Sequence, residues 1–148
     1  MKKFFLLTLM LTGFFAASFA QTQYKVITVV ESIIPMGLGR SRMIETKTEV
    51  NAKDFTTERT KGNDSKQGDV DRGDIKADAF AETKLLNFFS AVGINFQNIA
   101  SNDAVVTSRL NQLSEEGWNL AFVTSGVESV GGKDDGEGIF ITRYVFKK

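Results

Sequence analysis

Two residue types that carry out much of protein chemistry at neutral pH are missing from this chain. None of its 148 residues is a cysteine or a histidine. Their absence excludes a cysteine nucleophile, a Ser-His-Asp triad, thiolate and imidazole metal sites, iron–sulfur clusters and disulfide bonds. The Gly-Lys-Ser/Thr phosphate loop, the Gly-x-Ser-x-Gly elbow and the Ser-x-x-Lys pair are also absent. We therefore predict that the protein is not an enzyme and holds no metal and no cofactor.

A glycine- and arginine-rich turn is the strongest candidate for a binding site. It contains Gly37, Gly39, Arg40 and Arg42. Glycine amides can form a concave nest for an anion, and two guanidinium groups can hold a phosphate or a carboxylate. The turn lacks the third glycine of a dinucleotide-binding loop, and no helical pattern follows it. It predicts a weak site for a small anionic ligand; the alternative is a solvated basic turn.

Carboxylate chemistry remains open to the chain. Glycosidases work with two acidic side chains, and Glu31, Asp103 and Glu128 fall near the ends of the elements predicted below. Nothing in their spacing pairs them. A carboxylate-dependent glycan hydrolase therefore stays as an alternative to a protein without enzymatic activity.

Two other acidic segments predict solvated loops. The stretch from Asp69 to Asp74 departs from the spacing of an EF-hand, and its Arg-Gly-Asp tripeptide lies within a highly charged run. A second group, in a glycine-rich turn, could hold a hard cation weakly and is otherwise a solvated tip: Asp134, Asp135 and Glu137.

The first twenty residues have the pattern of a secretory signal peptide. Two lysines precede an apolar stretch from Phe4 to Phe15, and Ser18-Phe19-Ala20 supplies the small-x-small pattern needed for cleavage. The stretch is short for a membrane span, so an uncleaved anchor is the less favoured alternative. We predict cleavage near Ala20 and no transmembrane segment afterwards.

The net charge of the processed chain limits the classes of partner that it can bind. Removing Met1–Ala20 takes away two of 18 basic residues and none of 18 acidic ones, which leaves a net charge of −2. Such a body lacks the basic surface that binds nucleic acid or anionic lipid. A small exported domain without disulfides is more typical of a bacterial envelope than of a eukaryotic secretory route. We expect a periplasmic or secreted bacterial protein that does not bind nucleic acid.

The first half of the processed chain predicts strands followed by an insertion in a single domain. Tyr24–Ile33 is rich in β-branched residues and ends before Pro35, which predicts a strand, and Met43–Val50 predicts a weaker one. Residues 51–78 differ, because 13 of these 28 residues are charged. They cannot bury enough apolar surface to offset the entropy of ordering them. We predict a flexible insertion there.

Two helices, each ended by a glycine, are predicted in the middle of the chain. Leu86–Phe96 aligns with Leu110–Leu120, with leucine, asparagine, serine, glycine and asparagine in step. The pattern is typical of a helix, a glycine C-cap and a strand, present twice. It supports a helix over Ala79–Val92. The second helix, Asp103–Glu116, is predicted to start at a cap among residues 101–103 and has an apolar stripe formed by Val106, Leu110 and Leu113.

The end of the chain predicts a hairpin. Trp118–Val127 and Ile139–Phe146 both alternate, and the last strand is apolar on two sides, interrupted by Arg143. Two-sided apolarity indicates an interior strand or one covered by a partner chain. We predict an α+β fold, with an antiparallel sheet of three to five strands and one or two helices packed on one face.

An opening Tyr24-Lys25-Val26 strand, a helix ending in Gly117-Trp118 and a terminal strand together resemble the small bacterial domain of unknown function 4177. The resemblance covers Tyr24–Val30 and Asp103–Phe146, and the chain departs from that family's compact pattern between these segments. The resemblance implies a small α+β domain. It implies no activity and no functional residue.

We expect a non-enzymatic binding or interaction module of the cell envelope. Its partner would be another protein or a second copy, held by the loops or by an open face of the sheet. The alternatives are the glycan hydrolase and a carrier of a small anion at Arg40 and Arg42.

Overall fold

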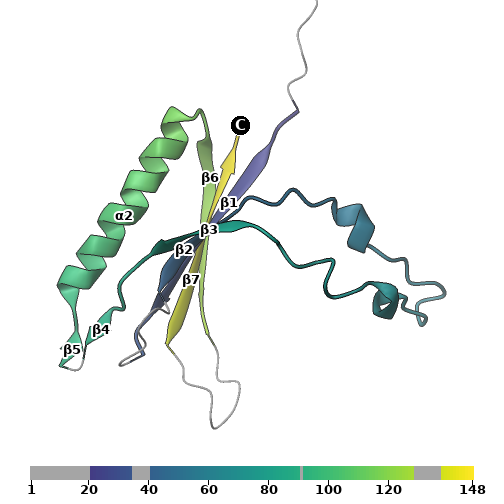
Figure 1. Cartoon of the computed structure of the whole chain (residues 1–148), viewed down its shortest axis with the longest axis horizontal. Helices are drawn as coiled ribbons and strands as arrows, with labels where there is room; N and C mark the ends of the chain where they lie inside the picture. The colour runs from purple at the N-terminus through teal and green to yellow at the C-terminus, as the bar shows by residue number, and fades with distance from the viewer. Residues whose placement is uncertain (1–20, 35–40, 91, 129–137) are drawn as a thin grey trace, which may run out of the picture.

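The computed structural model describes residues 21–34, 41–90, 92–128 and 138–148. These residues form a five-stranded antiparallel sheet in the order β3-β2-β1-β7-β6, a separate two-stranded ladder β4-β5 and the long helix α2 (Figure 1). The predicted α+β fold, with a helix on one face of an antiparallel sheet, is confirmed. The predicted signal peptide and the acidic tip near Asp134 lie outside the described residues.

Two long strands form the centre of the sheet. β1 (Tyr24–Ser32) pairs along its whole length with β7 (Ile139–Lys147). On one side β1 also pairs with β2 (Arg42–Thr46), which pairs with β3 (Phe80–Lys84). On the other side β7 pairs with β6 (Asn119–Val127), which forms the opposite edge. The hairpin predicted at the end of the chain is present.

The hydrophobic core lies between the sheet and α2. Alternate residues of β1 point to the same side, and Ile27 and Val29 are buried there against the helix. The apolar stripe predicted for the helix faces them, with Val106 and Leu113 buried and Leu110 half-buried. The buried cluster is Ile27, Val29, Met43, Leu85, Val106, Leu113 and Phe146.

α2 spans Phe96–Glu115, so the predicted start at Asp103 is wrong by about two turns. The true N-cap is Asn95, whose side chain accepts a hydrogen bond from the Asn98 amide at 3.1 Å. The predicted glycine stop is present. Gly117 has a φ of 87°, and the amide that follows it donates to the Leu113 carbonyl at 2.9 Å.

The helix predicted over Ala79–Val92 is also wrong. The chain there forms β3 and then β4 (Phe89–Ser90), which pairs with β5 (Gly93–Ile94). β3 forms because its backbone pairs with the edge of β2. The two strands are more than thirty residues apart in the sequence, so local patterns do not reveal this contact. β2 itself ends at Thr46, short of the predicted Val50.

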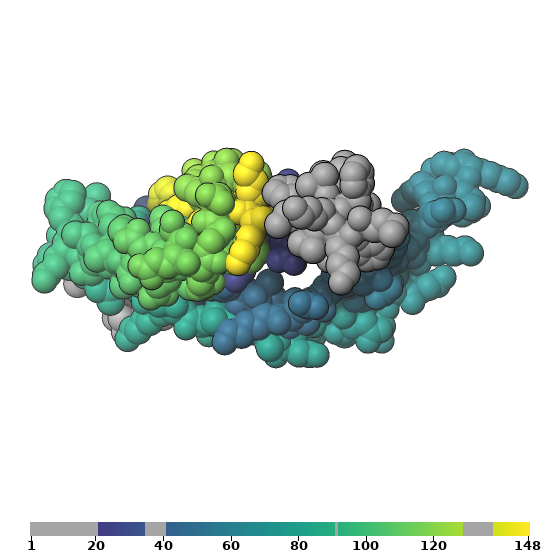
Figure 2. Space-filling model, turned by 90° about the horizontal axis from the view of Figure 1, so that it is seen from above, coloured from purple at the N-terminus to yellow at the C-terminus, as the bar shows by residue number. Residues whose placement is uncertain are grey.

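Residues 48–78 form an arm that leaves the sheet between β2 and β3. The arm begins and ends at one place, where the Lys47 amide donates to the Ala79 carbonyl at 3.0 Å. It contains two short 3₁₀ helices, η1 (Ala52–Phe55) and η2 (Gln67–Asp69), with no buried residue in either. It projects on the side of the sheet opposite α2 (Figure 1) and extends well beyond the sheet and the helix when seen from above (Figure 2).

Among the described residues, no helix combines the length and the apolar character needed to cross a bilayer.

Candidate functional site

The two faces of the sheet differ in what covers them. One face, the helix face, packs against α2 through Ile27, Val29 and their neighbours. The other, which we call the open face, carries the alternate residues of each strand. Register places the following together on it: Val26, Thr28 and Val30 of β1; Ile44 of β2; Phe80 of β3; Ile141, Arg143 and Val145 of β7; and Phe122 and Thr124 of β6. Towards the β3 edge the same face also carries charge, from Arg42 of β2 and from Glu82 and Lys84 of β3.

The open face presents large apolar side chains from several strands to solvent. Val26, Phe80 and Phe122 are 41%, 49% and 56% exposed, and Tyr24 at the end of β1 is 67% exposed. Isolated apolar residues are ordinary on a protein surface, but a contiguous group on one flat face marks an interaction surface. The open face is therefore the first candidate for a functional surface.

Arg143 is an exposed cation within this apolar surface. Its partners across the two ladders are Thr28 on β1 and Thr124 on β6, both uncharged. Within the described part of the chain, no carboxylate forms an ion pair with it. A cation placed in this way can pair with an acidic group brought by a partner.

On the helix face, a polar cluster ties α2 to the sheet. The Glu45 carboxylate of β2 accepts two-pronged hydrogen bonds of 2.9–3.0 Å from Arg109 of α2 and one of 3.0 Å from Lys25 of β1. Burial raises the pKa of Glu45, but the hydrogen bonds and positive charges of Lys25 and Arg109 outweigh burial, so its pKa is lowered overall. The cluster uses its charges internally, which indicates a structural role.

The same cluster continues to Trp118 and to the end of α2. The ammonium groups of Lys25 and Lys148 lie 5.0 and 5.9 Å from the centre of the Trp118 ring. Lys148 also donates to the Glu116 carbonyl at 2.7 Å, and the Glu116 carboxylate pairs with Arg109 at 2.9 Å. Trp118 is partly buried and packs against the core.

Two of the three predicted carboxylates, Glu31 and Asp103, interact electrostatically beside the N-terminal half of α2. Glu31 accepts a hydrogen bond of 3.0 Å from the buried Asn102 amide. Burial raises the pKa of Glu31, the Asn102 hydrogen bond lowers it and the negative charge of Asp103 raises it, with a net increase. Burial and the charges of Glu31 and Asp103 likewise raise the pKa of Tyr144. The sequence placed Glu31 and Asp103 near the ends of predicted elements, but nothing in it indicated that the two residues interact.

The groove of about 540 Å³ beside Asp103 is lined by residues of α2 alone, and Glu31 is not part of it. Glu128 follows β6 and lines a separate shallow cavity of about 240 Å³ on the open face with Ile141 and Arg143.

The structure describes only part of the predicted anion site. Gly37, Gly39 and Arg40 lie outside the described residues. Arg42 lies in β2 and forms an ion pair of 2.6 Å with Glu82 of β3, so a carboxylate already faces this cation. The anion site stays a prediction. In the described ranges, no group of three or more acidic side chains is placed to hold a metal ion.

Comparison with known proteins gave no match to a family model, to a curated protein or to a solved structure. The described residues form a small α+β domain in which α2 packs on one face of the antiparallel sheet.

Proposed function

We propose that this protein is an interaction module of the bacterial envelope that binds another protein through the open face of its sheet. The observation that carries the proposal is the exposed apolar group of Tyr24, Val26, Phe80 and Phe122 on a face that α2 does not cover. The resemblance to the domain of unknown function 4177 is part of the same proposal, and the succession of β1, α2, β6 and β7 supports it.

The chemistry of the open face defines the partner. Its apolar side chains call for a protein surface of similar character, because burying both removes apolar area from water. Arg143 calls for a carboxylate near the centre of that surface, because a cation buried without a partner would oppose binding. The expected partner is therefore a folded protein with an apolar patch and a central acidic residue.

Crosslinking in the native cell tests this proposal. A photoreactive amino acid at Phe122 should yield a discrete protein adduct, and Arg143→Glu in the same chain should reduce its yield several-fold. The control position is Asn111, exposed on α2. No adduct from position 122, or an adduct equally strong from position 111, would contradict binding through the open face.

Export is part of the same proposal. It is supported by the sequence of Met1–Ala20 alone. Mass spectrometry of the protein from fractionated cells should find a processed N-terminus near Gln21 in the periplasm or the medium. Protein that keeps Met1 in the cytosol would contradict it.

A glycan hydrolase remains the second candidate, favoured by one observation. Burial and the negative charge of Asp103 raise the pKa of Glu31, as is required of a carboxyl group that acts as a general acid. The purified protein should then release reducing ends from peptidoglycan, and Glu31→Gln should abolish the release. No release by the unaltered protein removes this candidate.

A further inference from the structure

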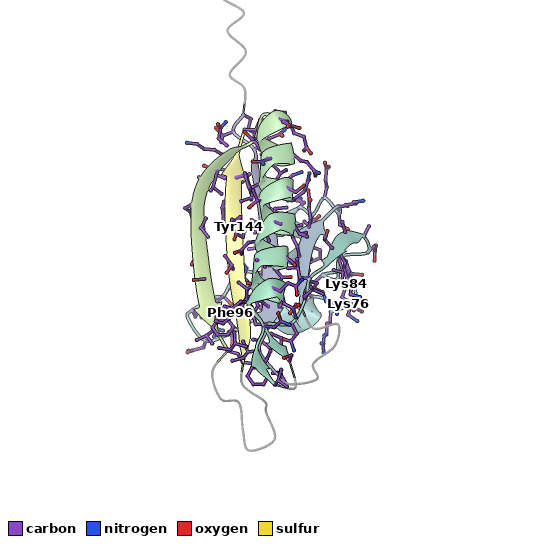
Figure 3. The ribbon with its side chains drawn as sticks, turned by 90° about the vertical axis from the view of Figure 1, so that its left-hand side faces the viewer. Lys76, Lys84, Phe96 and Tyr144 are labelled. Carbon is purple, nitrogen blue, oxygen red and sulfur yellow. The ribbon has the colours of Figure 1, made fainter. Side chains whose placement is uncertain are left out.

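Among the described strands, β6 has a partner on one side only. It pairs with β7 and forms an edge of the sheet. Figure 3 shows β6 beside α2, and not beneath it, on the side away from β3. All nine of its residues are exposed, and its sequence Asn-Leu-Ala-Phe-Val-Thr-Ser-Gly-Val contains neither a charge nor a proline. Such an edge lacks the features by which proteins usually prevent pairing with another strand.

The hydrogen-bond pattern shows which backbone groups of β6 point outward. The Glu128 amide donates to the Ile139 carbonyl at 2.9 Å, so residue 128 faces β7. In an antiparallel ladder, facing alternates along the strand. Register with β7 continues unbroken from Phe122 to Val127. The amide and carbonyl groups of Val123, Ser125 and Val127 therefore point away from β7, to the free edge.

The other edge of the sheet is built differently. β3 has only five residues, and Glu82 and Lys84 are two of them. Short length and charge both discourage a further strand. The contrast between the edges identifies β6 as the one that can accept a strand.

The side chains of β6 add apolar area to this edge. Leu120, Val123 and Val127 on the helix face are 50%, 48% and 63% exposed, and Phe122 on the open face is 56% exposed. Leu120 precedes the bulge; the other three side chains present on the order of 300 Å² per copy, so two copies bring roughly 600 Å² before backbone and small residues are counted. Stable interfaces bury about 1,200–2,000 Å² in total. Two β6 edges thus supply much of what a stable dimer needs.

We propose that two copies of this chain join through antiparallel pairing of their β6 strands, with the twofold axis at Ser125. In this register Ser125 lies opposite Ser125 of the second copy, and Val123 lies opposite Val127. The three outward-facing residues of each strand then form about six hydrogen bonds. The bulge near Ala121 ends the paired stretch on one side.

A second copy fits this edge better than an unrelated strand does. β6 carries no charge, so pairing it with β6 of a second copy leaves no unpaired charge between the two strands. A twofold axis perpendicular to the sheet keeps helix faces together, so Val123 contacts Val127 of the second copy. The proposal concerns the β6 edge, and does not depend on a partner at the open face.

Proline at Ser125 tests the pairing without disturbing the β7 ladder. The Ser125 amide points to the free edge, so Ser125→Pro removes only an outward donor. Light scattering on the purified protein should show a dimer, and Ser125→Pro should weaken dimerisation about tenfold or more, because two amides are lost per dimer. Ser125→Ala is the matched control and should leave the dimer unchanged. A monomer at high micromolar concentration, or a Ser125→Pro dimer of unaltered affinity, would overturn the proposal.

A cysteine at the twofold axis tests the register. The chain has no cysteine of its own, and residues opposite each other in such a pair have Cα atoms about 5.5 Å apart, within reach of a disulfide. Mild oxidation should link Ser125→Cys into a covalent dimer, whereas Thr83→Cys on the exposed β3 edge should stay unlinked. Equal linking at both positions, or none at 125, would overturn the register. Arg143→Glu should leave the dimer intact, which separates failure here from failure of the open-face proposal.

Discussion

The buried Asn102 amide offers the sharpest test of how α2 is held. Its side chain is 1% exposed and makes three hydrogen bonds. It donates to Glu31 at 3.0 Å and to the Leu86 carbonyl at 2.8 Å, and it accepts from the Leu86 amide at 2.7 Å. The substitution Asn102→Asp keeps the shape of the side chain but replaces both donated protons by a negative charge.

This substitution should destabilise the protein strongly at pH 7. Two donated hydrogen bonds are lost, one of them to a charged group, and a carboxylate then faces both the Glu31 carboxylate and a carbonyl oxygen. We expect a loss of about 3–5 kcal/mol, a large part of the ~5–15 kcal/mol that stabilises a typical domain. Asn111→Asp on the exposed side of α2 is the matched control, with an expected change within about 0.5 kcal/mol.

The pH dependence of the loss gives it a second signature. Burial and the nearby Glu31 charge raise the pKa of the introduced carboxyl, so the folded variant binds more protons than the unfolded one. Its stability therefore rises as the pH falls towards about 4, because the protonated group can donate again. Urea unfolding followed by the fluorescence of the single tryptophan measures this at both pH values. A pH-independent difference, or a loss no larger than that of Asn111→Asp, would refute the account of Asn102.

Four further outcomes are expected. Replacing residues 49–78 by a short turn should preserve the fold and raise the unfolding free energy by up to about 2 kcal/mol, because a shorter loop costs less entropy to close; loss of cooperative urea unfolding would contradict this. Glu45→Gln should cost about 1–3 kcal/mol at neutral pH. Because the pKa of Glu45 is lower in the folded state, its ionised carboxylate stabilises the fold at pH values above the unfolded pKa near 4.5, and this contribution is lost as the pH falls through the folded pKa. Glu45→Gln lacks this contribution, so it should lose less stability on acidification than the unaltered protein does. Thermal melts at several pH values measure the difference. Gly117→Ala places a side chain at a φ of 87° and should cost about 1–2 kcal/mol in urea titrations, and an unchanged midpoint would count against strain there. Leu113→Ala, at a site with 0% exposure, should cost about 2–5 kcal/mol by the same assay, whereas a cost below that of Gly117→Ala would place the core elsewhere.

Local patterns predicted the parts of the fold whose side chains face one core. β1 alternates because the sheet has two sides, and Val106 and Leu113 recur at helical spacing because α2 packs along one stripe. The end of the helix at Gly117 could also be predicted from the sequence, because the left-handed backbone conformation that ends a helix depends on the residue at that position. These elements needed no knowledge of distant partners.

The errors arose where distant contacts decide the structure. The segment now seen as β3 pairs with β2 across the arm, and the glycine pattern near Gly93 belongs to the small β4-β5 ladder instead of a helix end. Asn102 was assigned as a possible cap because its side chain suits that role. Its hydrogen bonds to Leu86 and Glu31 depend on where the sheet lies, which the sequence does not reveal.

The candidate surfaces were predictable only in outline. Two-sided apolarity predicted that the last strand is either interior or covered by a partner chain, and β7 is interior. An open face of the sheet was expected, but not which residues lie on it. The difference between the two sheet edges became apparent only when strand order was known, because charge on β3 and its absence on β6 matter solely at the edges.

The charges on β3 limit how far copies of this protein can assemble. Once two β6 strands are joined, the outermost strands of the combined sheet are two copies of β3, each bearing Glu82 and Lys84. Among the described strands, the combined five-stranded sheets then have no second uncharged edge to recruit another molecule. A twofold contact of this kind closes on itself, so growth ends with a discrete particle and does not continue into a fibre.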